Sequence, residues 1–220
     1  MKLLIVDDVR SFLDLETTFL RRADCQVLTA STGLEAIRVA RDAQPDVIVL
    51  DVEMPEMNGI EATRILKANP ALSRIPVIIC SSTQREAESM AAGAQEFVHK
   101  PIDEERFLAV VQRHVPLKVR SEPRRGLDAP CRFTKDGVFH DARIGDVSVS
   151  GLFLETRALL AIGDDLSLAF QLPLSGGHKE INAEGLVVRA AEGGYGLGFR
   201  LISEGDRWLV QEFVAAAAED

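Results

Sequence analysis

Short apolar runs in the first half of the chain alternate with segments in which apolar residues recur at helical spacing. The runs Leu3–Val6, Val47–Leu50 and Val77–Cys80 are rich in β-branched residues and too short for helices. Such runs are typical of fully buried strands in a parallel sheet. Ser11–Asp14 has the character of a capping box and predicts a helix from there to about Ala23. Five strand–helix units predict a doubly wound α/β domain.

The pattern changes near Pro116, where basic residues and prolines replace the strand–helix rhythm. Further on, apolar and polar residues alternate over 166–172 and 195–201, which is the period of half-buried strands. Turn residues at Ser175–Gly177 and Glu192–Gly194 separate these strands. A small antiparallel β-barrel is therefore predicted.

A terminal helix is predicted from about Glu204, and the alanine run 215–218 with the acidic end is expected to fray. We therefore predict one α/β domain over residues 1–116 and one β-barrel domain over residues 117–220. A linker at about 115–123 would join them.

Composition agrees with two folded domains and narrows their function. The chain has 220 residues, 46% of them hydrophobic, which is ample for two cores. A net charge of −9 argues against coating nucleic acid or an anionic membrane. Three widely spaced cysteines suggest neither disulfides nor a zinc site, and neither a secretory leader nor a long apolar span is apparent. A cytoplasmic protein without membrane insertion is expected.

Reactive polar residues stand where the apolar runs of the first domain stop. Asp7 and Asp8 follow Leu3–Val6, and Asp51 follows Val47–Leu50. Ser81 follows Val77–Cys80, and Lys100 follows the short run Phe97–His99. Because carboxyl ends of parallel strands meet at one edge, these side chains should converge. Clustered carboxylates favour a hard cation such as Mg²⁺, and an aspartate can attack phosphorus. With an ammonium and a hydroxyl nearby, the pattern predicts a phosphoryl-handling site.

On these residues, 1–116 resemble a response-regulator receiver domain. The resemblance implies that Asp51 accepts a phosphoryl group from a histidine kinase or phosphotransfer protein. It also implies that Asp7, Asp8, Asp51 and the backbone carbonyl of Glu53 hold Mg²⁺. No external substrate would be turned over, so the protein would not be an enzyme.

The same resemblance assigns residues to the response that follows phosphorylation. Ser81 and Lys100 would grip the phosphoryl group, Phe97 matches an aromatic switch position, and Pro101 would follow a cis bond. Ser81 and Lys100 are 19 positions apart (100 − 81), about one helical turn fewer than is usual in the family. A shortened fourth helix is therefore expected. It argues against dimerisation through the face of the fourth helix and fifth strand, which the family commonly uses, and it does not decide whether the protein forms a homodimer.

A second constellation lies in the predicted barrel domain. Arg120 and Arg124 are four residues apart, and Asp146, Ser148 and Gly151 follow in a polar turn. Guanidinium groups bind phosphates and guanine edges, and aspartate accepts hydrogen bonds from guanine nitrogens. Both halves of the motif therefore favour a ligand that contains guanine and phosphate. The alternative reading is a solvated linker followed by an ordinary hairpin turn.

Residues 118–220 resemble a PilZ domain through Arg-x-x-x-Arg and Asp-x-Ser-x-x-Gly, supported by Gly196–Phe199 as a late Gly-x-x-Phe strand. The resemblance implies cyclic di-GMP as ligand. The two arginines would clamp phosphates and guanine faces, and the aspartate and serine would read a guanine edge. Ser121 stands where a second arginine is frequent, and Arg125 is a candidate for an added contact.

Together these patterns predict a signalling protein that responds to phosphorylation of Asp51 and to cyclic di-GMP, and that acts by binding an unidentified protein partner. A first alternative keeps the receiver but makes the barrel a protein-interaction module that binds no nucleotide. A phosphatase of the haloacid dehalogenase type would need a second aspartate two positions after the first, where Val9 stands instead. DNA binding is disfavoured because no helix-turn-helix follows the receiver.

Overall fold

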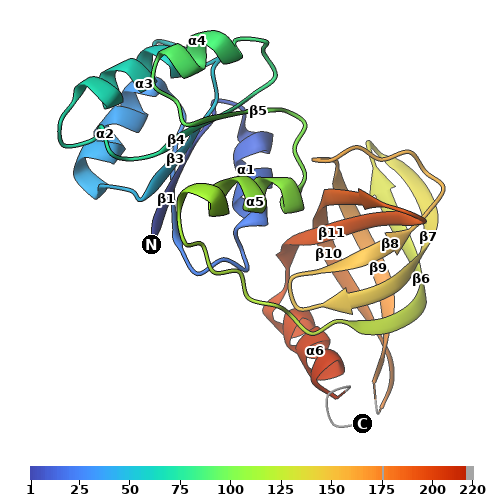
Figure 1. The fold of residues 1–220 in the computed structure, drawn as a ribbon. Helices are drawn as coiled ribbons and strands as arrows, with labels where there is room; N and C mark the ends of the chain where they lie inside the picture. Colours follow the sequence, from blue (N-terminus) through green and yellow to red (C-terminus); the bar gives the residue numbers. More distant parts are fainter. Residues whose placement is uncertain (175, 217–220) are drawn as a thin grey trace. The chain divides into compact units, whose positions relative to one another are not determined.

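The computed structural model describes residues 1–174 and 176–216, so the predicted turn residue Ser175 and the predicted fraying of 217–220 lie outside it. The chain divides into two compact units, Met1–Val119 and Arg120–Asp220. Figure 1 shows the elements of both units along the chain. No helix of the described residues is long and apolar enough to cross a bilayer.

The first unit is a parallel five-stranded sheet between two layers of helices, which confirms the doubly wound prediction (Figure 1). The strands lie in the order β2-β1-β3-β4-β5. Helices α1 and α5 pack together on one face, and α2, α3 and α4 lie on the other. The elements are β1 (Lys2–Val6), α1 (Arg10–Phe19), β2 (Gln26–Ala30), α2 (Gly33–Ala43), β3 (Val47–Leu50), α3 (Gly59–Ala68), β4 (Val77–Ser81), α4 (Glu86–Ala91), β5 (Glu96–His99) and α5 (Glu104–His114).

Two helices bear directly on the predictions. The capping box predicted at Ser11–Asp14 is wrong, because α1 already begins at Arg10 and its N-cap, Val9, makes no side-chain cap bond. The cause is local: the Asp7 carboxylate accepts a hydrogen bond from the Val9 amide at 2.8 Å and turns the chain directly after β1. Helix α4 has only six residues, which confirms the trimmed fourth helix.

The end of the first unit is bonded to the connection between α1 and β2 of the same unit. Val119 forms an antiparallel bridge with Ala23, and the amide of Asp24 donates to the Lys118 carbonyl at 2.8 Å. Leu117 is buried. The contact boundary between the units therefore falls directly before Arg120.

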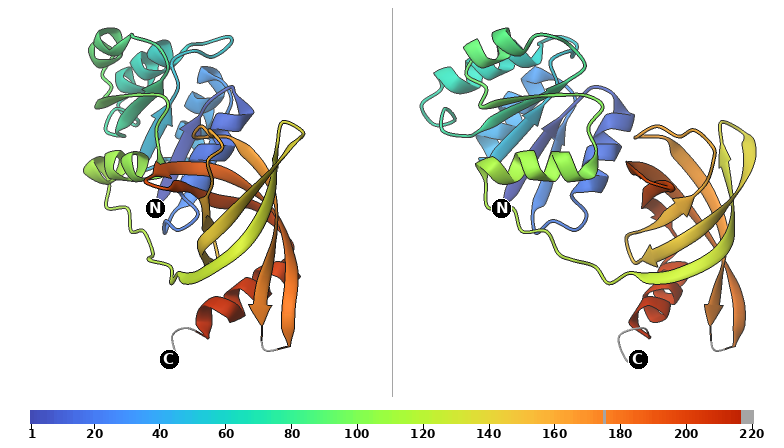
Figure 2. Two further views of the ribbon diagram at one scale, coloured as in Figure 1. Left: turned by 90° about the vertical axis from the view of Figure 1, so that its right-hand side faces the viewer. Right: turned by 45° about the vertical axis from the view of Figure 1, so that its right-hand side comes forward.

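The second unit is a closed antiparallel barrel with strand order β10-β11-β8-β7-β6-β9, as predicted (Figure 2). Its core is a single apolar cluster to which α6 contributes Val210, Phe213 and Val214. The elements are β6 (Arg125–Lys135), β7 (Val138–Ser148), β8 (Gly151–Glu155), β9 (Asp165–Leu174), β10 (Gly177–Ala191), β11 (Gly194–Ile202) and α6 (Glu204–Ala215).

Candidate functional site

The strand-end residues of the first unit gather at the carboxyl edge of the sheet, as the sequence predicts. They line one hollow of about 200 Å³. Asp7, Asp51 and Ser81 are buried, whereas Asp8 is exposed. The lining residues are Asp7, Asp8, Val9, Phe12, Asp51, Glu53, Ser81, Ser82 and Lys100.

Lys100 is the centre of this site. Its ammonium forms a short ion pair with Asp7 and lies 3.3 Å from Oδ1 of Asp51. The same nitrogen lies 4.2 Å from the ring centroid of Phe12, a cation–π contact. The Lys100 amide donates to the Ser81 carbonyl at 3.0 Å, and the bond to Pro101 is cis, as expected.

The electrostatics of the edge leave an excess of negative charge. Burial raises the pKa of Asp7 even though Lys100 opposes the shift. Burial alone would lower the pKa of Lys100, but the carboxylates of Asp51 and Asp7 outweigh it and raise that pKa. One buried ammonium thus faces two buried carboxylates, with a third at Asp8 exposed beside them. Carboxylate oxygens beside an uncompensated negative charge are the kind of ligand that Mg²⁺ prefers.

The arrangement differs from the predicted one in a single respect. The sequence predicted three converging carboxylates, yet no group of three or more Asp, Glu, His or Cys side chains that could hold a metal occurs among residues 1–174 and 176–216. Asp8 is exposed, and the Lys100 ammonium lies between Asp7 and Asp51. The cation that contacts both buried carboxylates is the Lys100 ammonium.

The backbone around Asp51 is fixed on both sides. Its Oδ2 accepts a hydrogen bond from the Glu53 amide at 2.8 Å, while Gly59 donates its amide to the Val52 carbonyl at 2.9 Å. A Cβ on Gly59 would lie 1.9 Å from the Asp51 carbonyl oxygen, so only glycine allows α3 to start this close. Asn58 and Glu61 complete a capping box at that helix start.

The predicted switch residues lie beside the same edge. Ser81 is 1% exposed and accepts a weak hydrogen bond from the Thr83 hydroxyl at 3.4 Å. Phe97 is half-buried against the core and meets His99 edge-on, with ring centroids 4.9 Å apart. Ser81 and His99 are partners in the β4–β5 ladder, which brings the hydroxyl next to the strand that leads into Lys100.

A buried acid that the sequence did not indicate lies behind this edge. Glu16 of α1 is 3% exposed, and burial raises its pKa to about 8, with Asp7 and Asp51 adding to the shift and Lys100 and the Cys80 thiol opposing it. Its position on the apolar face of α1 is the only sequence signal. An acid on such a face between Leu13 and Leu20 is the feature that would have revealed it.

In the barrel, the two predicted motif halves meet. The guanidinium of Arg124 contacts Oδ1 of Asp146 through Nε at 2.7 Å and Nη2 at 2.5 Å. Its Nη1 donates to the Ser148 hydroxyl at 3.3 Å. The register of β6 with β7 places Gly126 opposite Asp146, which explains why these distant segments adjoin.

Several motif residues hold the turn itself. Ser148 is wholly buried and donates its hydroxyl to the Gly151 carbonyl at 3.2 Å. A Cβ on Gly151 would lie 1.9 Å from the carbonyl oxygen of Leu197 on β11. Glycine at 151 is therefore required by the close approach of β11, and Ser148 is bonded within the turn. Direct contact of either residue with a nucleotide stays a prediction.

The two remaining arginines of the region differ. Arg120 is exposed and makes no hydrogen bond or ion pair with the described part of the chain. Arg125 donates Nη1 to the Phe213 carbonyl at 2.7 Å and lies over the Phe213 ring at 4.3 Å. Arg125 thus anchors α6, while Arg120 is available to a ligand.

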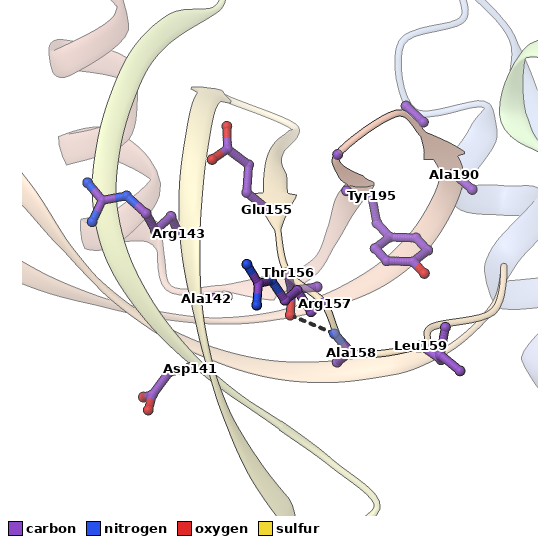
Figure 3. A pocket seen from close by; sticks show the side chains of 13 residues that line it. Asp141, Ala142, Arg143, Glu155, Thr156, Arg157, Ala158, Leu159, Ala190 and Tyr195 are labelled. Carbon is purple, nitrogen blue, oxygen red and sulfur yellow. Dashed lines mark hydrogen bonds between the residues drawn. The ribbon is translucent and has the colours of Figure 1, made fainter.

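A larger hollow of about 970 Å³ lies elsewhere on the barrel surface (Figure 3). It lies between β7, the β8–β9 loop and the β10–β11 turn, and Arg143, Arg157 and Tyr195 line it. Within it, Thr156 accepts a hydrogen bond from the Ala158 amide at 3.1 Å. None of the predicted nucleotide residues lines this hollow.

Both halves of the chain now define a class of protein. The first unit carries two buried aspartates and a lysine at the carboxyl edge of a doubly wound sheet, and the barrel carries Arg124 bonded to Asp146 and Ser148. Together they form the architecture of a two-domain signalling regulator. Residues 3–112 match the response regulator receiver domain, and the chain belongs to that family. Residues 118–216 match the PilZ domain.

Individual relatives match the receiver half. Protein PilH of Pseudomonas aeruginosa is 36% identical over 113 residues, covering 50% of this chain and 93% of the relative. Chemotaxis protein CheY of Listeria monocytogenes is 32% identical over 118 residues, covering 51% and 97%. The structure of the chemotaxis response regulator CheY4 of Vibrio cholerae superposes with a TM-score of 0.50 at 32% identity, covering 52% of this chain and 98% of that one.

Proposed function

We propose that this response regulator integrates two inputs, a phosphoryl group on Asp51 and cyclic di-GMP on the PilZ barrel, and passes the result to a protein partner. A histidine kinase or phosphotransfer protein in the cytoplasm supplies the phosphoryl group. The observation that carries the first input is the buried edge where one ammonium, Lys100, serves the two carboxylates of Asp7 and Asp51. The protein accepts a signal and turns over no external substrate.

The chemistry follows from the side chains at this edge. A carboxylate oxygen of Asp51 attacks phosphorus as the N–P bond of the phosphohistidine breaks, which leaves an aspartyl phosphate and a free imidazole. Lys100 offers its charge, and Ser81 its hydroxyl, to the phosphoryl oxygens. Asp7, Asp8, Asp51 and the Glu53 carbonyl would hold Mg²⁺, which when bound neutralises phosphoryl charge.

Phosphorylation from a small donor tests this input without the kinase. The purified protein is incubated with acetyl phosphate and MgCl₂, and intact mass is measured. We expect one phosphoryl group on the parent and none on Asp51→Asn or after EDTA. The control Asp42→Asn changes an acid that lies outside the site. A phosphoryl group that persists on Asp51→Asn would refute the assignment.

The second input rests on the meeting of Arg124, Asp146 and Ser148. Titration calorimetry with cyclic di-GMP tests it, and we expect Arg124→Ala to lose binding while Arg157→Ala, an exposed arginine outside the motif, keeps it. The alternative, a protein-interaction barrel without nucleotide, draws on the fact that Arg124 and Asp146 already satisfy each other. It predicts a flat titration for the parent as well.

The two inputs should also be coupled. Val119 is bridged to Ala23 in the receiver unit, and the first motif arginine, Arg120, is the next residue. A shift at the end of the receiver would therefore reach the motif through the chain itself. Calorimetry with and without beryllium fluoride measures the coupling, and an unchanged nucleotide affinity would refute it.

A further inference from the structure

One carboxylate joins the two halves of the nucleotide motif. Glu122 lies between Arg120 and Arg124 in a segment without regular secondary structure. Its Oε2 accepts a hydrogen bond from the backbone N–H of Ser150 at 3.1 Å. Glu122 is half-buried, whereas its neighbours Ser121 and Pro123 are exposed.

The partner of Glu122 is a fixed point. Ser150 belongs to the turn between β7 and β8, and its carbonyl accepts from the Phe199 amide of β11 at 2.7 Å. The Ser148 hydroxyl closes the same turn onto Gly151. The backbone of Ser150 is thus bonded on both sides: its carbonyl accepts from β11 and its N–H donates to Glu122.

The consequence concerns the arginines on either side. A mobile Arg-x-x-x-Arg segment would have to be ordered when ligand binds, and that entropy would reduce affinity. Contact with the turn anchors the backbone midway between the two guanidinium groups. Pro123, with its fixed φ, further limits the path between Glu122 and Arg124.

We infer that Glu122 is the positioning residue of the nucleotide site, a clasp that holds the arginine segment on the Ser148–Gly151 turn. This inference rests on the proposed nucleotide binding. Being anionic, Glu122 is unsuited to contact a phosphate, so it acts through Arg120 and Arg124. The competing possibility is that Glu122 occupies an N–H that a phosphate would use, in which case it would weaken binding.

Calorimetry with cyclic di-GMP on the full chain separates these roles. Glu122→Ala removes the acceptor and is expected to weaken binding about tenfold, whereas Glu122→Gln keeps an acceptor oxygen and should stay within about twofold of the parent. Glu192→Ala, in an exposed turn, is the matched charge control and should bind like the parent. Tighter binding by either Glu122 variant, or parent-like binding by Glu122→Ala, would overturn the inference.

Amide hydrogen exchange without nucleotide gives an independent readout. Exchange at Ser150 should be faster in Glu122→Ala than in the parent, and protection should return in Glu122→Gln. Unchanged exchange in Glu122→Ala would overturn the clasp whether or not nucleotide binds. Faster exchange in that variant, combined with a parent that binds no nucleotide, would instead overturn the proposed ligand and leave Glu122 a purely structural contact.

Discussion

The buried acid Glu16 should make the stability of the receiver fall as pH rises through neutrality. Its pKa is about 8 in the folded chain against an ordinary 4.5, chiefly because burial disfavours its charged form. The folded state therefore holds a proton that the unfolded state has already released. Glu16→Gln keeps the shape and a polar amide but cannot ionise, so it should remove this dependence.

The size of the effect follows from the pKa difference. A difference of 3.5 units (8 − 4.5) corresponds to about 5 kcal/mol of unfolding free energy, lost between about pH 4.5 and pH 8. Between pH 6 and pH 8 the loss is about 2 kcal/mol. Glu16 is 3% exposed, so little solvent reaches its carboxyl group.

Urea denaturation at several pH values in EDTA measures the prediction. The only tryptophan and the only tyrosine, Trp208 and Tyr195, both lie in the barrel, so far-UV circular dichroism follows the helix-rich receiver and tryptophan fluorescence follows the barrel. Glu105→Gln, an exposed acid on α5, is the control. If parent and Glu16→Gln lose receiver stability in parallel from pH 6 to 8, the reasoning about Glu16 is refuted.

Three further substitutions test individual contacts by urea denaturation. Lys100→Met leaves two buried carboxylates facing each other and should cost the receiver roughly 3–5 kcal/mol in EDTA, less with MgCl₂; an equal loss in both would count against the cation site. Gly151→Ala places a Cβ 1.9 Å from a backbone oxygen and should cost about 1–3 kcal/mol, whereas Gly176→Ala, with open space around it, should cost much less. Arg125→Met removes the contact to Phe213 and should lower barrel stability by about 1–2 kcal/mol, which unchanged tryptophan-detected unfolding would contradict.

The site at the carboxyl edge of the receiver sheet could be predicted because residues that directly follow parallel strands all lie at the same edge of the sheet. Asp7, Asp51, Ser81 and Lys100 each follow an apolar run, and the strands end at one edge whatever the helices do. The barrel was harder. Strand β9 alternates between buried and exposed residues as predicted, but Leu201 near the end of β11 is exposed and Ile202 is buried in its place. Strands β6 and β7 contain register shifts, between Gly126 and Ala129 and between Ile144 and Asp146, and the period breaks there.

The residues that sequence reasoning missed act through contacts between distant segments. Phe12 of α1 is one example, because its ring contacts the Lys100 ammonium from a segment 88 positions away (100 − 12). Glu122 lies 28 positions from its partner Ser150, and nothing in the local pattern connects them. Each pairing joins segments that are far apart in the sequence, so it depends on how the strands and helices pack and cannot be read from periodicity.

The two sites share a feature that changes how their ligands should bind. In each, the cation predicted to contact phosphate is already paired with a carboxylate of the same site: Lys100 with Asp7 and Asp51, and Arg124 with Asp146. An incoming phosphate would therefore exchange partners with an existing pair, and its net gain would be the difference between two charge-assisted contacts. Removing Asp146 would free Arg124 at the same time as it removes a guanine acceptor. The affinity of such a variant therefore reports the sum of two opposite effects, and Arg124 is the cleaner position at which to test nucleotide binding.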